Sequence, residues 1–241
     1  IDKVAQHCYT ALPYPDIIPP DNNNRRDVGF LDYVASLPRW EADLLQDVTE
    51  HQHATCSLYT ALTSKSSIFA VSDGGAKAQF GSFGFVVATQ DQILWSGKGA
   101  ARGDPIQSFR AEAYGRLAAL RFLKRYVQFY NINLHDECTV LSFTDSKSLL
   151  QRENREWDWT DYYPGACLTA DHDVLRMLRE TRKELPFDTS CTHVKGHQDR
   201  LNSAEPLKWE AELNIVADRL ASEALQDLVD TKRIPLPMIP F

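Results

Sequence analysis

The sequence predicts an α/β protein built on a mixed five-stranded sheet that is flanked by helices. Strand-like runs of apolar or small residues come first, in close succession from Ile68. Long segments with apolar residues at helical spacing then alternate with two further strand-like runs. Parallel neighbours in a sheet need helical crossovers, whereas antiparallel neighbours can be joined by short turns. The order of elements therefore predicts three antiparallel meander strands and two further parallel strands.

The meander comprises the first three predicted strands. These strands are rich in apolar or small residues and span 68–73, 83–89 and 92–101. Asp91-Gln92 makes a tight connection between the second and the third, as in an antiparallel hairpin. This part of the sheet therefore needs no helical crossover.

Helices and strands alternate in the rest of the predicted domain. A helix is predicted over 109–128 because Phe109, Ala113 and Leu117 continue an apolar rhythm of three and four residues. The elements expected after it are a strand at 138–144, a helix that begins near Asp145, a helix at 172–184, a strand at 187–195 and a helix from about 208 to 227.

The first 67 residues have a different character. Four prolines among the first 20 residues, followed by the polar run 21–26, predict irregular chain with turns. A helix is predicted across Pro38–Val48, with Pro in its first turn, and 63–67 reads as a linker. We expect an N-terminal extension at 1–67, a globular domain at 68–226 and a C-terminal tail at 227–241. Because the chain begins with Ile1 and not with Met, we also expect it to be a piece of a longer protein.

The composition indicates a soluble protein of a reducing compartment. Hydrophobic residues make up 43% and charged residues 24% of the chain, as in ordinary globular proteins. No apolar stretch is long enough to cross a bilayer, so no membrane partner is expected. The five cysteines are odd in number and widely scattered, without a C-x-x-C pair. This pattern argues against a disulfide framework and a zinc knuckle, and it indicates an intracellular location, in the cytoplasm or the nucleus.

The net charge of −7 counts against a nucleic-acid partner, because phosphate binding usually shows a basic footprint. The charge is unevenly distributed. Residues 68–226 carry 19 Lys and Arg against 22 Asp and Glu. Two bound divalent cations would offset this small acidic excess, since bound metals are the largest local charges in such a site. The objection is weakened but not removed.

Four acids are spaced so that one site could collect them: Asp73, Glu112, Asp145 and Asp218. Asp73 and Asp145 each end a buried-strand pattern, and in open α/β sheets sites form at the carboxyl ends of strands. Glu112 lies in the first turn of the predicted 109–128 helix, and Asp218 lies on the rim of the apolar face of the last helix. Carboxylates this close raise each other's pKa unless cations neutralise them. The spacing therefore predicts a site for a hard divalent cation such as Mg²⁺, with solvated surface charge as the alternative for any single acid.

Short motifs around these acids resemble type I ribonuclease H, and most of all the kind encoded by retroelements, where it follows a reverse transcriptase. The motifs are Asp73-Gly74-Gly75, Phe109-Arg110-Ala111-Glu112, Phe143-Thr144-Asp145-Ser146, the run from His193 to Asp199, and Asn214-x-x-x-Asp218. The resemblance covers about residues 68–226. It implies a ribonuclease H-like fold, hydrolysis of the RNA strand of an RNA–DNA hybrid, and two Mg²⁺ ions as cofactor, for which Mn²⁺ can substitute.

The resemblance also implies a role for each matching residue. The four acids match the metal ligands, with Asp73 central among them, and His197 matches a mobile histidine that assists proton transfer and product departure. Four further residues fall at positions that touch substrate or support the acids: Gly75, Arg110, Ser146 and Asn214. Recognition of RNA requires contacts to the 2′-hydroxyl, for which Glu112, Ser146 and the main chain around Gly75 are candidates.

Two features depart from the family pattern. Some members grip the hybrid with a basic protrusion, but the corresponding residues 155–164 here carry one basic and three acidic side chains. Affinity for the hybrid is therefore expected to depend on another region, such as a reverse transcriptase domain of the same polyprotein. The extension 1–67 resembles nothing in the family and is interpreted as a remnant of a polymerase–nuclease connection.

Two alternative functions stay open at the level of the sequence. One is a strand-transfer enzyme of the integrase or transposase type, which shares the fold and a carboxylate–Mg²⁺ site but usually has three acids and lacks the loop around His197. The other is a non-catalytic module that binds hybrid or braces a polymerase. The presence of all four acids and the histidine argues against the second alternative.

Overall fold

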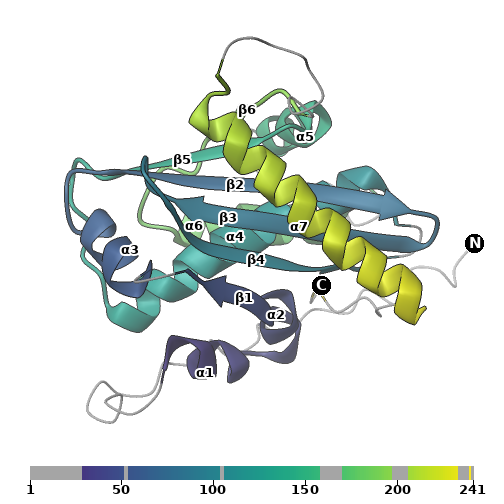
Figure 1. Ribbon diagram of the computed structural model, residues 1–241, viewed down its shortest axis with the longest axis horizontal. Coiled ribbons are helices and arrows are strands. Elements are labelled where there is room, and N and C mark those ends of the chain that lie inside the picture. The colour runs from purple at the N-terminus through teal and green to yellow at the C-terminus, as the bar shows by residue number, and fades with distance from the viewer. Residues whose placement is uncertain are drawn as a thin grey trace, which may run out of the picture.

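The computed structural model describes residues 29–51, 54–103, 106–157, 170–196, 206–232 and 239. Its strands are β1 (Asp47–Glu50), β2 (Ser67–Lys77), β3 (Phe80–Ala88), β4 (Ile93–Ala101), β5 (Thr139–Thr144) and β6 (Cys191–His193). Its helices are α1 (Phe30–Ala35), α2 (Arg39–Leu44), α3 (Ala54–Leu62), α4 (Ser108–Tyr130), α5 (Lys147–Trp157), α6 (His172–Glu184) and α7 (Trp209–Thr231). Figure 1 shows these elements around one sheet.

The mixed sheet that the sequence predicts is confirmed. The strand order is β1-β4-β3-β2-β5-β6. Strands β2, β3 and β4 form the antiparallel meander, while β5 pairs parallel with both β2 and β6. The hairpin between β3 and β4 closes with a hydrogen bond from the Thr89 amide to the Gln92 carbonyl, 2.9 Å long, so the tight connection at Asp91-Gln92 is also confirmed.

The number of strands and two element boundaries were predicted wrongly. A sixth strand, β1, pairs antiparallel with β4, and the helix expected across Pro38–Val48 ends at Leu44. Val48 and Thr49 are β-branched and favour a strand once a free edge is beside them. The strand expected at 187–195 is only three residues long. The Asp188 carboxylate accepts hydrogen bonds from the amide and hydroxyl of Ser190, a local turn that competes with strand pairing.

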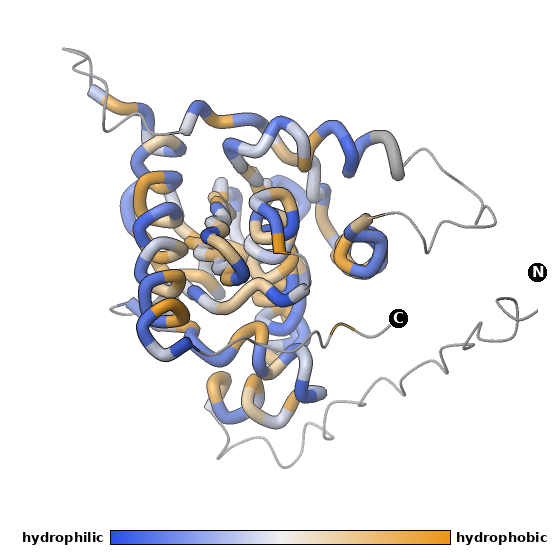
Figure 2. Tube along the Cα trace, turned by 90° about the vertical axis from the view of Figure 1, so that its right-hand side faces the viewer, coloured by the Kyte–Doolittle hydropathy of each residue, from blue (hydrophilic) through white to orange (hydrophobic). Residues whose placement is uncertain are grey.

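Helices cover both faces of the sheet. Helix α4 packs on β2 and β3 from one side, and α7 packs on the same strands from the other. In the side view of Figure 2 the strands lie between helices whose hydrophobic residues alternate with hydrophilic ones. The larger hydrophobic cluster lies on the α4 side, and a smaller one around Val71, Val86 and Leu213 lies under α7. No described helix is both long and apolar enough to cross a membrane.

The described part of the extension 1–67 contributes residues to the larger hydrophobic cluster. Phe30 of α1 is buried and makes edge-on contacts with Trp95, Phe122 and Tyr126 at centroid distances of 5.4–5.7 Å. Glu41 of α2 is fully buried and is held by guanidinium groups of α4. The segment therefore packs as part of the same core as the strands, with β1 extending the sheet.

Truncation of Phe30 tests how far the fold depends on this segment. We expect Phe30→Ala to lower the free energy of unfolding by about 3–5 kcal/mol, because it leaves a cavity among six aromatic rings. Urea unfolding followed by fluorescence would measure the change. The neighbouring Leu31 is 47% exposed, and Leu31→Ala should cost less than about 1 kcal/mol. Equal losses in the two variants would contradict the packing of α1 on the core.

Candidate functional site

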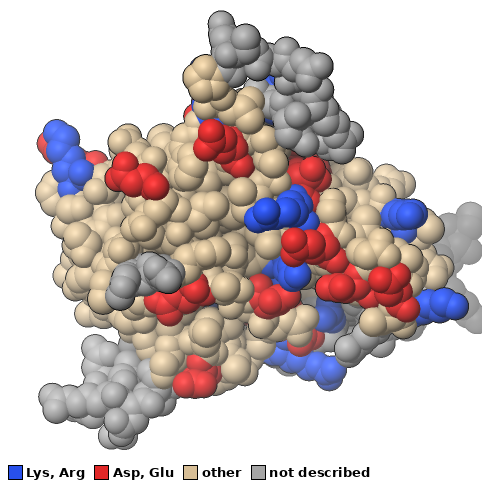
Figure 3. Space-filling view, in the orientation of Figure 1, with Lys and Arg blue, Asp and Glu red and all other residues tan. Residues whose placement is uncertain are grey.

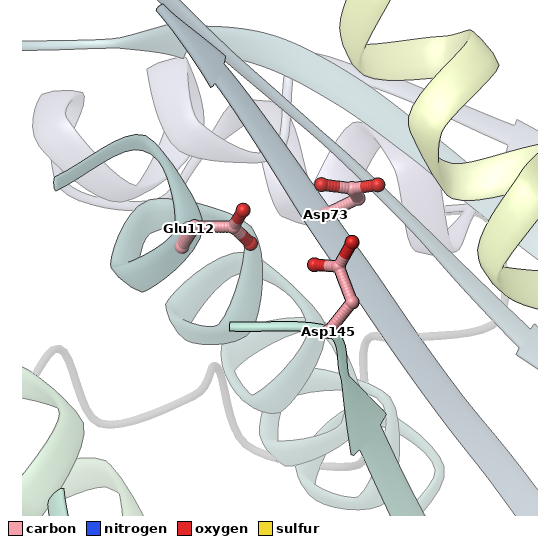
Figure 4. A group of neighbouring side chains, drawn as sticks. All are labelled: Asp73, Glu112 and Asp145. Atoms are coloured by element: carbon pink, nitrogen blue, oxygen red, sulfur yellow. The ribbon is translucent and has the colours of Figure 1, made fainter. Parts of the chain in front are cut away.

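Three of the four predicted acids meet where the parallel pairing of β2 with β5 ends. The expected strand end at Asp73 is wrong, because β2 continues in its pairing with β3 to Lys77. Asp73 lies in β2 two residues beyond its last pairing with β5, Asp145 follows β5 directly, and Glu112 projects from the N-terminal part of α4. One carboxylate oxygen from each residue lies within 4.8 Å of the other two. Figure 4 shows the three carboxylates turned toward one another. The predicted convergence is thus present for these three residues.

Glycines set the short distance between β2 and α4. A Cβ atom at Gly74 would overlap the backbone of Ala111 and Glu112, and a Cβ atom at Gly115 would lie 2.8 Å from the Asp73 carbonyl oxygen. Only hydrogen fits at both positions, so the strand and the helix touch backbone to backbone. This contact places Glu112 directly beside Asp73.

Burial and mutual repulsion shift the charge state of the site. Burial, with the charges of Asp145 and Asp218 added to it, raises the pKa of Asp73 from 3.8 to about 7. Burial, with the charges of Asp73 and Asp145, also raises the pKa of Glu112 well above its usual value. The Gly74 amide donates a 2.6 Å hydrogen bond to Asp73 Oδ1, which opposes the shift only in part. Without a cation the site therefore binds protons near neutral pH.

Asp218 approaches the site from the other face of the sheet. It is half-buried on α7 and lies outside the three-residue group, but its charge contributes to the raised pKa of Asp73. Gly84 pairs with Asp73 across β2 and β3, and a Cβ atom there would overlap the Ala217 carbonyl oxygen. A third close backbone contact therefore brings the turn of α7 that carries Asp218 toward Asp73.

The donor set fits a hard divalent cation. Carboxylate oxygens are the ligands that Mg²⁺ and Mn²⁺ prefer. Glu112 Oε2 is buried and has no hydrogen-bond partner among the described residues, although buried polar oxygens are normally satisfied. A cation at this point would satisfy that oxygen and relieve the repulsion between Asp73, Glu112 and Asp145.

Arg110 is held by protein acids. Its guanidinium forms a bidentate pair with Asp173 of α6, donates to Asp171 at 3.3 Å and donates to the Arg102 carbonyl. The side chain is buried. Arg110 thus anchors the start of α6 to α4, and its donors are not turned toward a substrate. The sequence could not show this because Asp173 lies 63 residues further along the chain.

The remaining predicted substrate residues lie in different surroundings. Ser146 accepts a hydrogen bond from the Leu149 amide and so caps the start of α5. Gly75 is half-buried in β2, with Leu225 of α7 as its nearest neighbour. Asn214 is buried in α7, and its Oδ1 has no hydrogen-bond partner among the described residues.

The predicted histidine lies outside the described residues, as do residues 158–164 of the acidic and aromatic stretch 155–164. His197 follows Gly196, the last described residue of its segment. A Cβ atom at Gly196 would collide with Asp145 Oδ2. The chain just before His197 therefore lies against the Asp145 carboxylate. Sequence reasoning missed Gly84, Gly115 and Gly196 as positions of close approach. Only Gly84 lies inside a strand, where a glycine can signal such an approach.

No protein-family model and no curated protein matches the sequence. Among solved structures, the chain is similar to the N-terminal RNase H domain of a Mycobacterium tuberculosis protein, with 17% identity and a TM-score of 0.45 over 70% of this chain and 99% of that one. It is also similar to RNase H1 of the archaeon Halobacterium salinarum, with 24% identity and a TM-score of 0.43 over 67% and 98%. A foamy viral protease–reverse transcriptase, solved with an RNA/DNA hybrid, shows 14% identity and a TM-score of 0.45 over 69% and 21%.

The raised pKa of Asp73 predicts how the free energy of unfolding depends on pH. A raised pKa means that the neutral form stabilises the folded state, fully at pH values below about 4, and that this contribution is lost as the pH rises through about 7. In EDTA at about pH 8, Asp73→Asn should therefore raise the free energy of unfolding by roughly 1–3 kcal/mol. At about pH 4 the gain should be small.

Urea unfolding at the two pH values measures this difference. Asp91 is exposed in the β3–β4 turn, so Asp91→Asn is a control that should change stability little at either pH. A gain for Asp73→Asn that is the same at both pH values would show that repulsion and burial of the charge are not its cause.

Proposed function

We propose that this chain is an endonuclease that hydrolyses the RNA strand of RNA–DNA hybrids with the help of two Mg²⁺ ions. The observation that carries the proposal is the cluster of Asp73, Glu112 and Asp145 beside the end of the parallel pairing of β2 with β5, with an oxygen from each within 4.8 Å of the others. The ribonuclease H-like motifs around each acid, on a mixed sheet with the predicted antiparallel meander and parallel strands, support it.

The four acids would hold the cations. Asp73, Glu112 and Asp145 supply the converging oxygens, and Asp218 adds charge from α7. Two divalent cations there would activate the attacking water and stabilise the leaving oxygen. Asp73 and Glu112 must lose their protons when cations bind, because only the carboxylate forms act as ligands.

Proton transfer is assigned to His197. An imidazole with an ordinary pKa of about 6.5 exchanges protons near neutral pH. The chain that leads to this residue passes Asp145 so closely at Gly196 that no side chain fits there. This approach supports a histidine that reaches the phosphate next to the metal ligands.

Selection of RNA requires groups that recognise the 2′-hydroxyl. Glu112, Ser146 and the main chain at Gly75 remain the candidates. Arg110 is assigned the supporting role of the two that its position implied, since Asp171 and Asp173 accept hydrogen bonds from its guanidinium.

The surface supports the view that the hybrid is gripped by another region. On the face that carries α7, acidic side chains gather over the C-terminal part of that helix (Figure 3), and they include the exposed Glu223, Asp227 and Asp230. The basic Lys98 and Arg219 are paired with Glu223. Such a surface repels phosphates. We therefore assign part of the affinity to a reverse transcriptase domain of the same retroelement polyprotein.

A cleavage assay with three labelled duplexes tests the proposal. In Mg²⁺, the protein should cut the RNA strand of an RNA–DNA hybrid and leave double-stranded DNA and double-stranded RNA intact. Asp145→Asn should reduce the rate by a factor on the order of 10³ or more, because it removes one of the charged ligands that would hold the cations. Asp136→Asn, at an exposed carboxylate in the loop before β5, should cleave as the wild type does.

Each of the other outcomes of this assay would indicate a different function. Hybrid binding without cleavage, by the wild type and by Asp145→Asn alike, would identify a non-catalytic binding module. Strand transfer or cleavage of double-stranded DNA would identify the integrase type. Cleavage that persists in Asp145→Asn would exclude the carboxylate cluster as the active site.

A further inference from the structure

A closed ring of buried hydrogen bonds lies beside the site and has no part in the chemistry described so far. Arg116 donates to both oxygens of Glu153, at 2.7 and 3.1 Å, and to the Thr189 carbonyl at 2.6 Å. Arg182 donates to Glu153 at 2.8 Å and to the Thr189 hydroxyl at 2.8 Å. Arg116 and Glu153 are among the most buried charged residues of the described chain, at 3% and 7% exposure.

The ring joins the three segments that carry acids of the cluster or lead to it. Arg116 lies four residues after Glu112 on α4, on the same side of the helix and about 6 Å further along it. Glu153 lies on α5, the helix that begins just after Asp145. Thr189 precedes β6, which leads to Gly196. One set of charge-assisted hydrogen bonds therefore fixes the helix of Glu112, the helix after Asp145 and the segment that ends against Asp145.

The segment after Thr189 has few other anchors in the sheet. Strand β6 pairs with β5 at only three positions, and the Val194 amide adds a 3.0 Å hydrogen bond to the Thr144 carbonyl. Gly196 then packs against Asp145 Oδ2. Because β6 is so short, the contacts of Thr189 with Arg116 and Arg182 determine where the chain enters the site.

We propose that the ring formed by Arg116, Glu153, Arg182 and Thr189 is a positioning device that holds Glu112, Asp145 and the Gly196 segment in register for metal binding and catalysis. The inference rests on the proposed nuclease function and deepens it. None of the four residues belongs to the carboxylate cluster of Asp73, Glu112 and Asp145, and each is assigned a role through the segment that carries it. Removal of Arg116 leaves Glu153 buried with Arg182 as its remaining partner, and the three segments lose their common anchor.

The same helix offers a matched control. Arg125 also forms a bidentate pair with a buried carboxylate, that of Glu41. It lies nine residues further along α4, about 13 Å from Arg116, on the side of the extension and away from the acids. Arg116→Gln and Arg125→Gln remove comparable ion pairs, so both should lower stability, but only Arg116→Gln should disturb the site.

Three measurements separate positioning from general stability. In Arg116→Gln, kcat for hybrid cleavage should fall by roughly 10–100-fold with KM changed less than about threefold, since misplaced groups cost rate more than ground-state binding. Its Mg²⁺ affinity, measured by calorimetry without substrate, should weaken on the order of tenfold. Amide hydrogen exchange across residues 191–196 should accelerate. Arg125→Gln should leave all three unchanged below its unfolding transition.

Milder variants keep the test decisive if Arg116→Gln folds poorly. Thr189→Val removes only the hydroxyl that accepts from Arg182 and should give a smaller change of the same kind. Arg116→Lys retains the charge and should recover part of kcat. The proposal is overturned if Arg116→Gln and Thr189→Val match Arg125→Gln in kcat, Mg²⁺ affinity and exchange. If the wild type cleaves no hybrid, the nuclease proposal fails, while Mg²⁺ affinity and exchange still decide the role of the ring.

Discussion

The contact of β2 with α4 at backbone distance is the constraint on which the site depends. Gly74 and Gly115 leave no room for a side chain between strand and helix, and Gly84 does the same between β3 and α7. Asp73 lies at the centre of these contacts, opposite Gly84 in the sheet and one residue before Gly74. Carboxylates that repel each other are therefore held together by packing that larger side chains would prevent.

Ion pairs that join α4 to three other helices oppose movement of α4. Arg116 pairs with α5, Lys124 pairs with α6, and Arg125 pairs with α2. These partners come from distant parts of the sequence, and each pair is buried on at least one side. The close glycine contacts and these ion pairs together hold α4 in place, and they oppose movement of Glu112 away from Asp73.

The sequence predicts most of this fold because strand runs, turns and helical spacing are local signals. Strand β1 was missed because its sequence does not alternate between apolar and polar residues as a half-buried strand does. Its formation depends on pairing with the free edge of β4. The convergence of two acids could be predicted, since topology alone brings Asp73 and Asp145 to one edge. The ion pair of Arg110 with Asp173 and the ring around Arg116 could not, because their partners come together only in the folded chain.

Buried carboxylates in this protein have two different kinds of surroundings: some are paired with guanidinium groups, and others face further acids. Glu41 and Glu153 are each held by two guanidinium groups, so their burial stabilises the packing of helices. Asp73 and Glu112 are about as buried but face each other and Asp145, so burial together with the neighbouring negative charges raises their pKa values. An arrangement that destabilises the metal-free fold is typical of a site shaped by the chemistry it performs. The destabilisation comes from Asp73 and Glu112, whose charges a divalent cation would neutralise. The neighbouring ring around Arg116 joins the segments that carry the acids, and it can oppose the repulsion between them.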